Sequence, residues 1–301
     1  MYDYCFYSNG KILLTGEYIL LKGALGLALP TKKGQFLLIK KLNHNKYFYW
    51  VSINEKKEIF FKAYFNFFSL NILYCSNIKI ALYIQNILKI IKKIKPFIFN
   101  IGLKIKTILE FPLNWGLGSS STLICNISKW TKINLYYLFK KISNGSGYDV
   151  YCSLYGSSLL YNLKNNKPNI NFIYFNPPFK KKLYFIYLNK KKNTEEEIIF
   201  FLKKKNNIIP IDLFNNFTKE ILKTKKLNIF ENVLFLYEKE ISKILNIKCI
   251  KEKYFKNYQG IVKSLGAWGG DFALVSKRKG MKNYFYKKGY NIIIPFEKMI
   301  L

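Results

Sequence analysis

Arginine, histidine and acidic residues are scarce in this sequence, although it is strongly basic. It has 50 lysine and arginine residues against 17 aspartate and glutamate residues, a net charge of +33 at pH 7, and a single histidine, His44. One histidine cannot supply a histidine-based acid–base pair or a His-rich metal site, so both are excluded. Arg278 is the only arginine, whereas nucleic-acid-binding surfaces typically use arginine for bidentate and stacking contacts. We therefore interpret the lysines as a solvated surface that attracts anionic substrates, and we expect no nucleic-acid partner.

Long apolar runs and metal-type cysteine spacings are also absent. The five cysteines are scattered and odd in number, which predicts reduced thiols in a cytoplasmic protein. Cys125 and Cys152 lie in apolar segments, so we expect both in the core. No run of 18 apolar residues occurs and no basic segment precedes the first apolar stretch, so neither a membrane span nor a secretory signal is expected. Half of the 301 residues are hydrophobic, which favours about two domains with a sizeable core.

One stretch, residues 112–121, has the composition of a phosphate-binding loop. Its sequence is PLNWGLGSSS, and it lies between an apolar run predicted as a strand and residues 122–130, predicted as a helix. Gly116 and Gly118 let a ligand approach the backbone, and the free N–H groups and positive dipole end of a helix stabilise an anion. The loop is neither a Walker A loop nor a dinucleotide-binding fingerprint, because it lacks Gly-Lys-Ser/Thr and a third glycine. The alternative of a flexible linker is disfavoured by the apolar elements on both sides.

Three further segments accompany this loop. GKILLTGEY at residues 10–18 is predicted to belong to a strand, a turn and another strand, and its Glu17 either pairs with a lysine or orients the turn. SGYD at residues 146–149 ends in an isolated acid, Asp149, which is interpreted as a catalytic carboxylate or as a helix N-cap. KSLGAWGGDFALV at residues 263–275 is a second Gly-rich loop between a predicted helix and a predicted strand.

In this order, the segments resemble the motifs of the GHMP kinases, the family of galactokinase, homoserine kinase, mevalonate kinase and phosphomevalonate kinase. The resemblance covers nearly the whole chain. It implies an α+β, two-domain GHMP kinase fold, with an N-terminal half like domain 2 of ribosomal protein S5 and a ferredoxin-like α/β C-terminal half. We place an N-terminal ATP-binding domain at residues 1–175 and a C-terminal domain at residues 176–301, because the segment 162–182 is polar and contains three prolines.

The resemblance also implies an activity, cofactors and roles for individual residues. The activity is transfer of the γ-phosphate of ATP, with Mg²⁺, to phosphomevalonate or mevalonate in isoprenoid precursor synthesis. Asp149 would accept or polarise the proton of the attacking hydroxyl, and Lys11 would hold that carboxylate ionised. Ser120 would help to hold Mg²⁺ with the ATP phosphates and water. ATP would bind along Pro112, Asn114, Gly116, Leu117, Gly118, Ser119, Ser120 and Ser121, and the acceptor would lie against Glu17, Ser146, Gly147, Gly266, Ala267, Gly269, Gly270 and Asp271.

Two positions depart from the family pattern. Mevalonate kinases carry a magnesium-binding glutamate where this chain has Leu138, and a small glycine is usual where it has Trp268. The segments around Asp149 and Asp271 favour the phosphomevalonate kinases within the family. Three alternatives stay open: an enzyme like diphosphomevalonate decarboxylase, an ATP-binding protein of this fold without turnover, and an RNA-binding protein, since related folds occur in ribosomal proteins.

Elsewhere, the spacing of apolar residues predicts the remaining elements. Helices are expected at residues 66–73, 78–94, 135–142, 210–225 and 229–245, and another is expected to begin at residues 194–197, where acids fill the first turn. Strands are expected at residues 36–39, 47–53, 58–64, 97–111 and 182–188, with a closing hairpin-like pair at residues 279–295.

Overall fold

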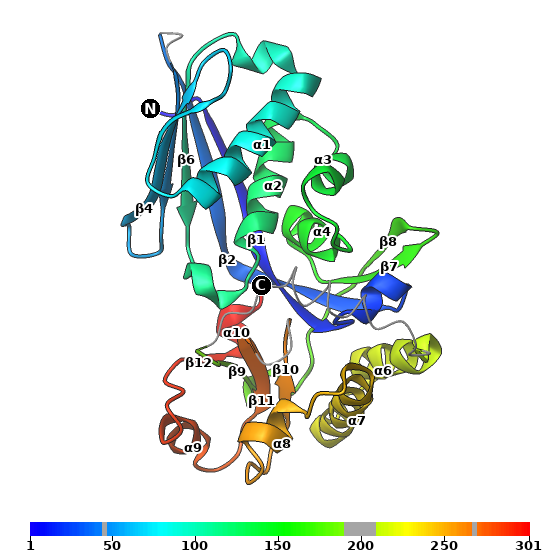
Figure 1. The fold of residues 1–301 in the computed structure, drawn as a ribbon. Coiled ribbons are helices and arrows are strands. Elements are labelled where there is room, and N and C mark those ends of the chain that lie inside the picture. The colour runs from blue at the N-terminus through cyan, green and yellow to red at the C-terminus, as the bar shows by residue number, and fades with distance from the viewer. Residues whose placement is uncertain (44–46, 190–208, 267–269) are drawn as a thin grey trace. The chain divides into compact units, whose positions relative to one another are not determined.

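The computed structural model describes residues 1–43, 47–189, 209–266 and 270–301 (Figure 1). The chain forms two compact units, each discontinuous in sequence. The first unit consists of residues 1–10, 33–113 and 118–155, and the second consists of residues 11–32, 114–117 and 156–301. A domain boundary at residue 175 stays a prediction, because these units are not separated by a single cut of the chain.

The first unit is built on a twisted mixed sheet. Its strand order is β5-β4-β3-β6-β2, and β1 pairs with β2. The β3 and β6 strands are parallel, whereas β2–β6, β3–β4 and β4–β5 are antiparallel. The strands are β1 (Tyr4–Thr15), β2 (Gly26–Lys41), β3 (Tyr47–Ile53), β4 (Ile59–Asn66), β5 (Ile72–Cys75) and β6 (Leu103–Leu109), of which β1 and β2 continue into the second unit.

Four helices cover one face of this sheet (Figure 1). They are α1 (Ile78–Ile94), α2 (Ser119–Thr131), α3 (Leu135–Ile142) and α4 (Tyr148–Tyr155). The first of them shows why the sequence folds this way. Asn77 caps its N-terminus by accepting a hydrogen bond from the Ile80 N–H, and its buried residues recur at helical spacing at Ala81, Ile84, Leu88 and Ile91. This apolar stripe packs against the sheet and completes the core of the unit.

The second unit contains the start of β2, a hairpin and a separate four-stranded sheet. The hairpin of β7 (Leu159–Lys164) and β8 (Lys167–Phe172) adds to the first residues of β2. The four-stranded sheet is antiparallel, in the order β10-β11-β9-β12. Its strands are β9 (Leu183–Tyr187), β10 (Val262–Ser264), β11 (Phe272–Ser276) and β12 (Ile293–Pro295). All five residues of β11 are buried, so this strand forms the centre of the unit.

The remaining described helices also belong to the second unit. The two long ones, α6 (Ile211–Lys223) and α7 (Leu227–Leu245), pack side by side (Figure 1). Shorter helices are α8 (Ile250–Tyr254), α9 (Met281–Tyr286) and α10 (Phe296–Met299). Four 3₁₀ turns complete the two units: η1 (Ile19–Lys22), η2 (Pro96–Phe99), η3 (Leu113–Trp115) and η4 (Lys180–Lys182).

The helices predicted at residues 78–94 and 135–142 and the strand at 47–53 are confirmed at their predicted bounds. Three expectations are wrong. Residues 66–69 form a turn instead of a helix, because the Asn66 side chain accepts the N–H groups of Phe68 and Ser69. The strand expected from residue 97 begins at Leu103, because Pro96 opens a 3₁₀ turn. The expected hairpin after residue 279 contains the helix α9.

The cysteines agree with the expectation from composition. All five cysteines are free thiols, and Cys125 and Cys152 are both buried, as predicted. Within the described ranges, no helix is both long and apolar enough to cross a bilayer. The segments around His44 and residues 194–197 lie outside the described residues.

Candidate active site

The predicted phosphate loop does lead into a helix N-terminus. Gly116 and Gly118 both have positive φ, at 65° and 89°, which L-residues with side chains rarely adopt. Helix α2 starts at Ser119, three residues before the predicted start, so the three serines form its first turn. Their backbone N–H groups are among the first of the helix, which have no partner within it. The arrangement is therefore a ready anion-binding end of a helix.

The serine hydroxyls of this turn differ in exposure. The Ser120 side chain is exposed, whereas Ser121 is 4 % exposed and its hydroxyl donates a hydrogen bond to Asp149 Oδ2 at 2.6 Å. Asp149 lies within the first turn of α4 and does not precede that helix, so the N-cap alternative does not hold. The bond fixes the Asp149 carboxylate against the first turn of α2, which places a candidate base next to the candidate phosphate site.

Helix α2 is anchored from behind by buried polar groups. The Thr122 hydroxyl lies 2.7 Å from Gln35 Oε1, and the Asn126 side chain donates to the Gln35 carbonyl at 2.8 Å. The Ser8 hydroxyl in turn donates to Asn126 Oδ1 at 2.8 Å. These bonds satisfy buried donors and acceptors and hold the helix on β1 and β2. The loop is thus mounted on a rigid support.

In the second unit, the middle of the loop contacts the first and third motifs. The Lys11 backbone N–H donates to Leu117 O at 2.9 Å, and its ammonium group donates to Gly116 O at 3.0 Å. The Asp271 carboxylate is so near to Gly116 that a Cβ there would lie 2.0 Å from Oδ2. The hollow that these residues share with Gly266 has a volume of only about 20 Å³. The contact is therefore tightly packed and requires a glycine in the loop.

Aromatic packing fixes the same part of the loop. The Trp115 ring lies edge-on to Phe272, with centroids 5.3 Å apart, and 6.3 Å from the Tyr187 ring. The Tyr187 hydroxyl donates to Asn114 O at 3.2 Å. Burial, reinforced by the nearby Asp271 charge, raises the pKa of Tyr187, so its hydroxyl keeps its proton as a donor near neutral pH.

Glu17 belongs to a buried polar cluster in the second unit. Its Oε1 accepts from Lys263 Nζ at 2.5 Å and its Oε2 accepts from the Tyr237 hydroxyl at 2.8 Å. Tyr237 in turn accepts the Gly16 N–H at 2.6 Å. Glu238 completes the cluster, with Oε1 3.4 Å from Lys263 Nζ and Oε2 3.3 Å from the Ser264 N–H. Of the two possibilities for Glu17, pairing with a lysine is the one that the structure shows.

Burial shifts the pKa of two groups in this cluster, Glu238 and Tyr237. Lys263 is 0 % exposed, and Glu17 and Glu238 are each 2 % exposed. Burial raises the pKa of Glu238 to about 7, although the Lys263 charge opposes this shift. Burial and the Glu17 charge raise the pKa of Tyr237 well above its ordinary value. Glu238 therefore exchanges its proton near neutral pH, whereas Tyr237 keeps its proton there.

Solved structures of three small-molecule kinases are similar to this chain over nearly its whole length. Mevalonate kinase from Methanococcus jannaschii matches with a TM-score of 0.69 and 18 % identity, over 97 % of this chain and 96 % of its own. Streptococcus pneumoniae phosphomevalonate kinase, solved with phosphomevalonate and AMPPNP, matches with a TM-score of 0.70 and 14 % identity, over 96 % of this chain and 99 % of its own. Lactococcus lactis galactokinase, solved with galactose, matches with a TM-score of 0.67 and 14 % identity, over 97 % of this chain and 93 % of its own. This chain has the GHMP kinase fold.

The likeness of this chain to these kinases is a likeness of structure. No protein-family model matches the sequence, and no curated protein matches it either. At identities of 14 to 18 %, the likeness establishes the fold alone. The resemblance inferred from the motifs and the α+β fold class are confirmed at this level.

The other predicted contacts of the GHMP kinase fold are placed as follows. Ser146 and Gly147 are buried beside the start of α4, and Gly147 has a φ of 93°. Gly270 is buried, and Gly266 lines the small hollow. Ala267, Trp268 and Gly269 lie outside the described residues. Pro112 is half-buried and directly precedes the turn η3, whereas Asn114 is exposed and lies within that turn.

Few side chains in the described part of this chain are placed to bind Mg²⁺. Leu138 is 0 % exposed and belongs to the core of the first unit, so no carboxylate replaces the family glutamate there. No group of three or more His, Cys, Asp or Glu side chains among the described residues could hold a metal. The exposed Ser120 hydroxyl at the anion-binding helix end suits an ion that arrives on ATP, since Mg²⁺ keeps several waters and binds substrate phosphates.

Sequence reasoning missed Tyr237, Glu238 and Lys263 as a polar cluster. A signal was present for Glu238, because it falls on the apolar stripe of α7 between Leu234 and Ile241, at helical spacing. An acid at such a position is buried by the same packing that buries its neighbours. Its lysine partner is 25 residues away on β10, and no local pattern connects the two.

Proposed function

We propose that this protein is an ATP-dependent kinase of the GHMP type, which transfers the γ-phosphate of ATP to the hydroxyl of a mevalonate-type acceptor. The observation that carries the proposal is the hydrogen bond from Ser121, in the first turn of α2, to the Asp149 carboxylate. It joins an anion-binding helix end to a side chain that can accept a proton. The neighbouring folds of mevalonate and phosphomevalonate kinases support the same activity.

In the proposed mechanism, the chain positions the reactants and stabilises charge. Backbone N–H groups at the start of α2 hold the ATP phosphates, and the exposed Ser120 hydroxyl contributes to holding the nucleotide with its Mg²⁺, which neutralises phosphate charge when bound. Asp149 accepts or polarises the proton of the acceptor hydroxyl. Lys11 steadies the loop through Gly116 O and provides positive charge. Positioning and charge stabilisation supply most of the rate.

We propose phosphomevalonate as the preferred acceptor and mevalonate as the second. The SGYD segment and the Gly-Gly-Asp version of the third motif support phosphomevalonate, as does the neighbouring phosphomevalonate kinase fold. An enzyme like diphosphomevalonate decarboxylase would use the same ATP loop and aspartate. A protein that binds ATP without turnover is favoured by one observation, the burial of Leu138 where mevalonate kinases have a magnesium ligand.

The test is ATP turnover by the purified protein with Mg²⁺, with mevalonate, phosphomevalonate, diphosphomevalonate and homoserine offered in parallel. Asp149→Asn should lower the rate by about 10²- to 10⁴-fold while ATP binding is retained, because it removes the proton acceptor. Asp212→Asn, which neutralises an exposed carboxylate on α6, is the matched control and should leave the rate unchanged.

The outcomes separate the alternatives. Phosphorylation of one acceptor with loss in the Asp149 variant supports the kinase and identifies its substrate. Release of CO₂ from diphosphomevalonate indicates the decarboxylase. ATP binding with no reaction of any acceptor contradicts the proposed kinase activity on these substrates, and a rate unaffected by Asp149→Asn contradicts the role of that residue.

A further inference from the structure

A second basic site lies at the opposite end of the four-stranded sheet from the loop contact. Strand β11 begins at Phe272, which packs against Trp115, and ends at Ser276. Because β9 is antiparallel to β11, Tyr187 pairs with Phe272 at one end and Leu183 pairs with Ser276 at the other. Four residue steps along the strand separate Phe272 from Ser276 by about 13 Å. The region beyond Ser276 is therefore distinct from the contact that residues 114–117 make with this sheet within the second unit.

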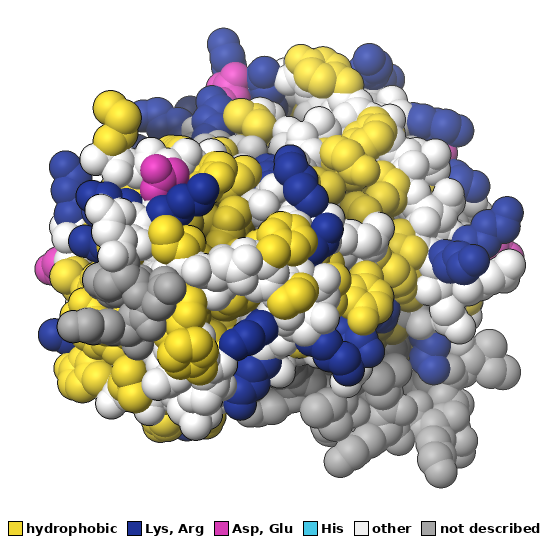
Figure 2. Space-filling view, turned by 90° about the horizontal axis from the view of Figure 1, so that it is seen from above, with side chains coloured by type: hydrophobic (Ala, Val, Ile, Leu, Met, Phe, Trp, Pro, Cys, Tyr) yellow, Lys and Arg dark blue, Asp and Glu magenta, His cyan; other side chains and the backbone are white. Residues whose placement is uncertain are grey.

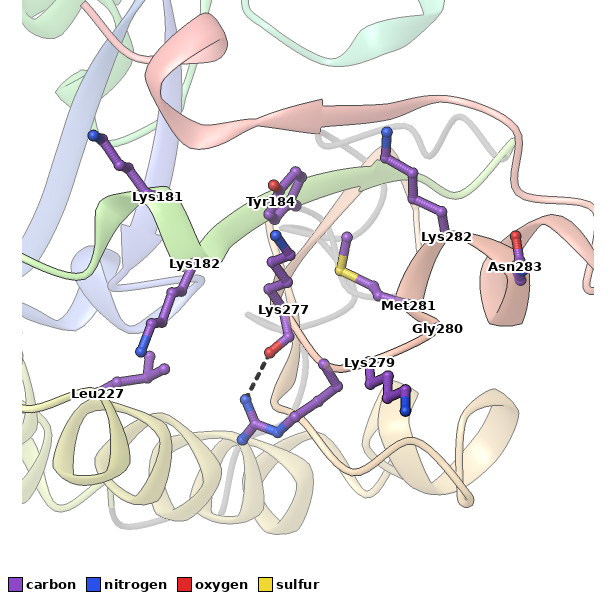
Figure 3. A pocket seen from close by; sticks show the side chains of 11 residues that line it. Lys181, Lys182, Tyr184, Leu227, Lys277, Lys279, Gly280, Met281, Lys282 and Asn283 are labelled. Atoms are coloured by element: carbon purple, nitrogen blue, oxygen red, sulfur yellow. Dashed lines mark hydrogen bonds between the residues drawn. The ribbon is translucent and has the colours of Figure 1, made fainter.

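Beyond that end there is a hollow of about 760 Å³. Its wall is formed by the segment before β9, the segment from Lys277 to Asn283 and Leu227 of α7 (Figure 3). Among the eleven described residues that line it, six are basic and none is acidic, whereas 50 of 301 residues are basic in the whole chain. The basic residues are Lys181, Lys182, Lys277, Arg278, Lys279 and Lys282. Figure 2 shows lysine and arginine side chains on one face of the molecule, interspersed with hydrophobic and other side chains.

The backbone places two of these lysines in opposite positions at the end of the sheet. The Lys277 N–H donates to Lys182 O at 2.7 Å, so the two lysines lie opposite each other where the strands end. Like charges in directly opposite positions destabilise a strand pair. Among the described residues, no carboxylate pairs with the ammonium groups of the five lysines, although lysines elsewhere, such as Lys243 and Lys263, do have acidic partners. An anion bound between them would remove this repulsion.

The support of the hollow is fixed by other bonds. Arg278 forms a bidentate pair with Glu231 of α7, at 2.7 and 2.8 Å, which attaches the segment after β11 to that helix. Met281 is buried, and together with Tyr184 and Leu227 it forms the apolar part of the wall (Figure 3). The ammonium groups therefore project from a fixed frame and not from a loose tail.

We propose that this hollow binds a small molecule that carries several phosphate groups. Five lysines with no acidic partner suit more than one phosphate, and the volume lies within the range of about 300–1,000 Å³ of small-molecule sites. Single-stranded nucleic acid is a poorer fit, because such sites stack bases on several aromatic rings and on arginine. Here Tyr184 is the one aromatic side chain of the wall, and Arg278 is engaged by Glu231.

The test uses inorganic tripolyphosphate as the probe on the whole chain. Binding is measured by calorimetry, and the site is located by the rate at which an amine-acylating reagent modifies each lysine, followed by mass spectrometry. The second measurement is needed because the loop at α2 also attracts polyphosphate. Tripolyphosphate should slow the modification of Lys182, Lys277 and Lys282 and leave Lys79, Lys89 and Lys93, which are exposed on α1, unaffected.

The matched variants replace three lysines by glutamine in each place. Lys182→Gln, Lys277→Gln and Lys282→Gln together should weaken the binding detected at the hollow by about tenfold, since each exposed ion pair contributes modestly. The control variant removes the same charge from α1, by Lys79→Gln, Lys89→Gln and Lys93→Gln. It should change the affinity for tripolyphosphate at the hollow less than about twofold. Equal effects of the two triple variants, or uniform protection of all lysines, would overturn the proposal. Stronger protection by a short single-stranded RNA than by tripolyphosphate would overturn it in favour of nucleic acid.

Discussion

Replacing Glu238 by glutamine should change how the stability of this protein depends on pH. Glu238 is buried beside Lys263 and Glu17, and its pKa is raised from 4.5 to about 7 by burial. The folded protein therefore holds the proton more tightly than the unfolded chain does. The contribution of Glu238 to the unfolding free energy is therefore fully present below pH 4.5 and is lost as the pH rises through about 7.

The size of the effect follows from the same two values. The difference between 4.5 and about 7 corresponds to about 3 kcal/mol of unfolding free energy, at ~1.4 kcal/mol for each pH unit. Glutamine resembles the protonated carboxyl group at every pH. The variant should therefore match the wild type near pH 4.5 and exceed its unfolding free energy by up to about 3 kcal/mol at pH 8.

The assay is urea unfolding at a series of pH values from 4.5 to 8.5, with the variant and the wild type compared at each one so that other titrating groups cancel. Glu240→Gln is the matched control, because Glu240 lies on the same helix and pairs with Lys243 at the surface. It should give a small difference that is constant with pH. A Glu238 variant whose difference from the wild type does not grow with pH, or grows with the opposite sign, would refute the reasoning.

Three other substitutions test the loop and the core. Gly116→Ala places a Cβ 2.0 Å from a carboxylate oxygen, so it should weaken ATP binding and lower the stability measured by thermal unfolding. Its control is Gly289→Ala, which also has positive φ but has open space around it. The control should lower the unfolding free energy by only about 1 kcal/mol. Ser121→Ala removes the hydrogen bond to the candidate base and should lower ATP turnover about tenfold; an unchanged rate would contradict this positioning role. Leu138→Glu should lower the unfolding free energy by at least about 3 kcal/mol, whereas Tyr137→Glu, at a 48 % exposed position of the same helix, should cost less than about 1 kcal/mol.

Local patterns predicted the elements whose formation is decided locally. The helix at residues 78–94 combines an Asn cap with a regular apolar stripe, and the loop at residues 112–121 combines glycines with a following helix. Both signals lie within a few residues of the feature that they predict. The helix at residues 78–94 and the helix that follows the loop are confirmed, whereas phosphate binding by the loop stays a prediction. The helix expected at residues 66–73 failed for a related reason, since the side-chain bonds of Asn66 favour a turn over continued helix.

Features that depend on distant partners were not predictable in this way. Glu17 was recognised as an acid that could pair with a lysine, but its partner was not identified among the many lysines of the chain. Lys263 was named only as the first residue of a motif, and its complete burial depends on β10, β11 and α7 coming together. The basic hollow depends in the same way on Lys182 and Lys277, which are far apart in sequence and opposite in the sheet.

The long sequence separations in the buried cluster have a consequence for how the second unit folds. The bonds of Glu17 to Tyr237 and Lys263 connect residues 220 and 246 positions apart. Contacts between residues so distant require a long loop to close before they form, which slows folding. Burying the Glu17 side chain without these partners would be costly. We therefore expect residues 11–32 to fold together with residues 237–263 in one step and not by themselves.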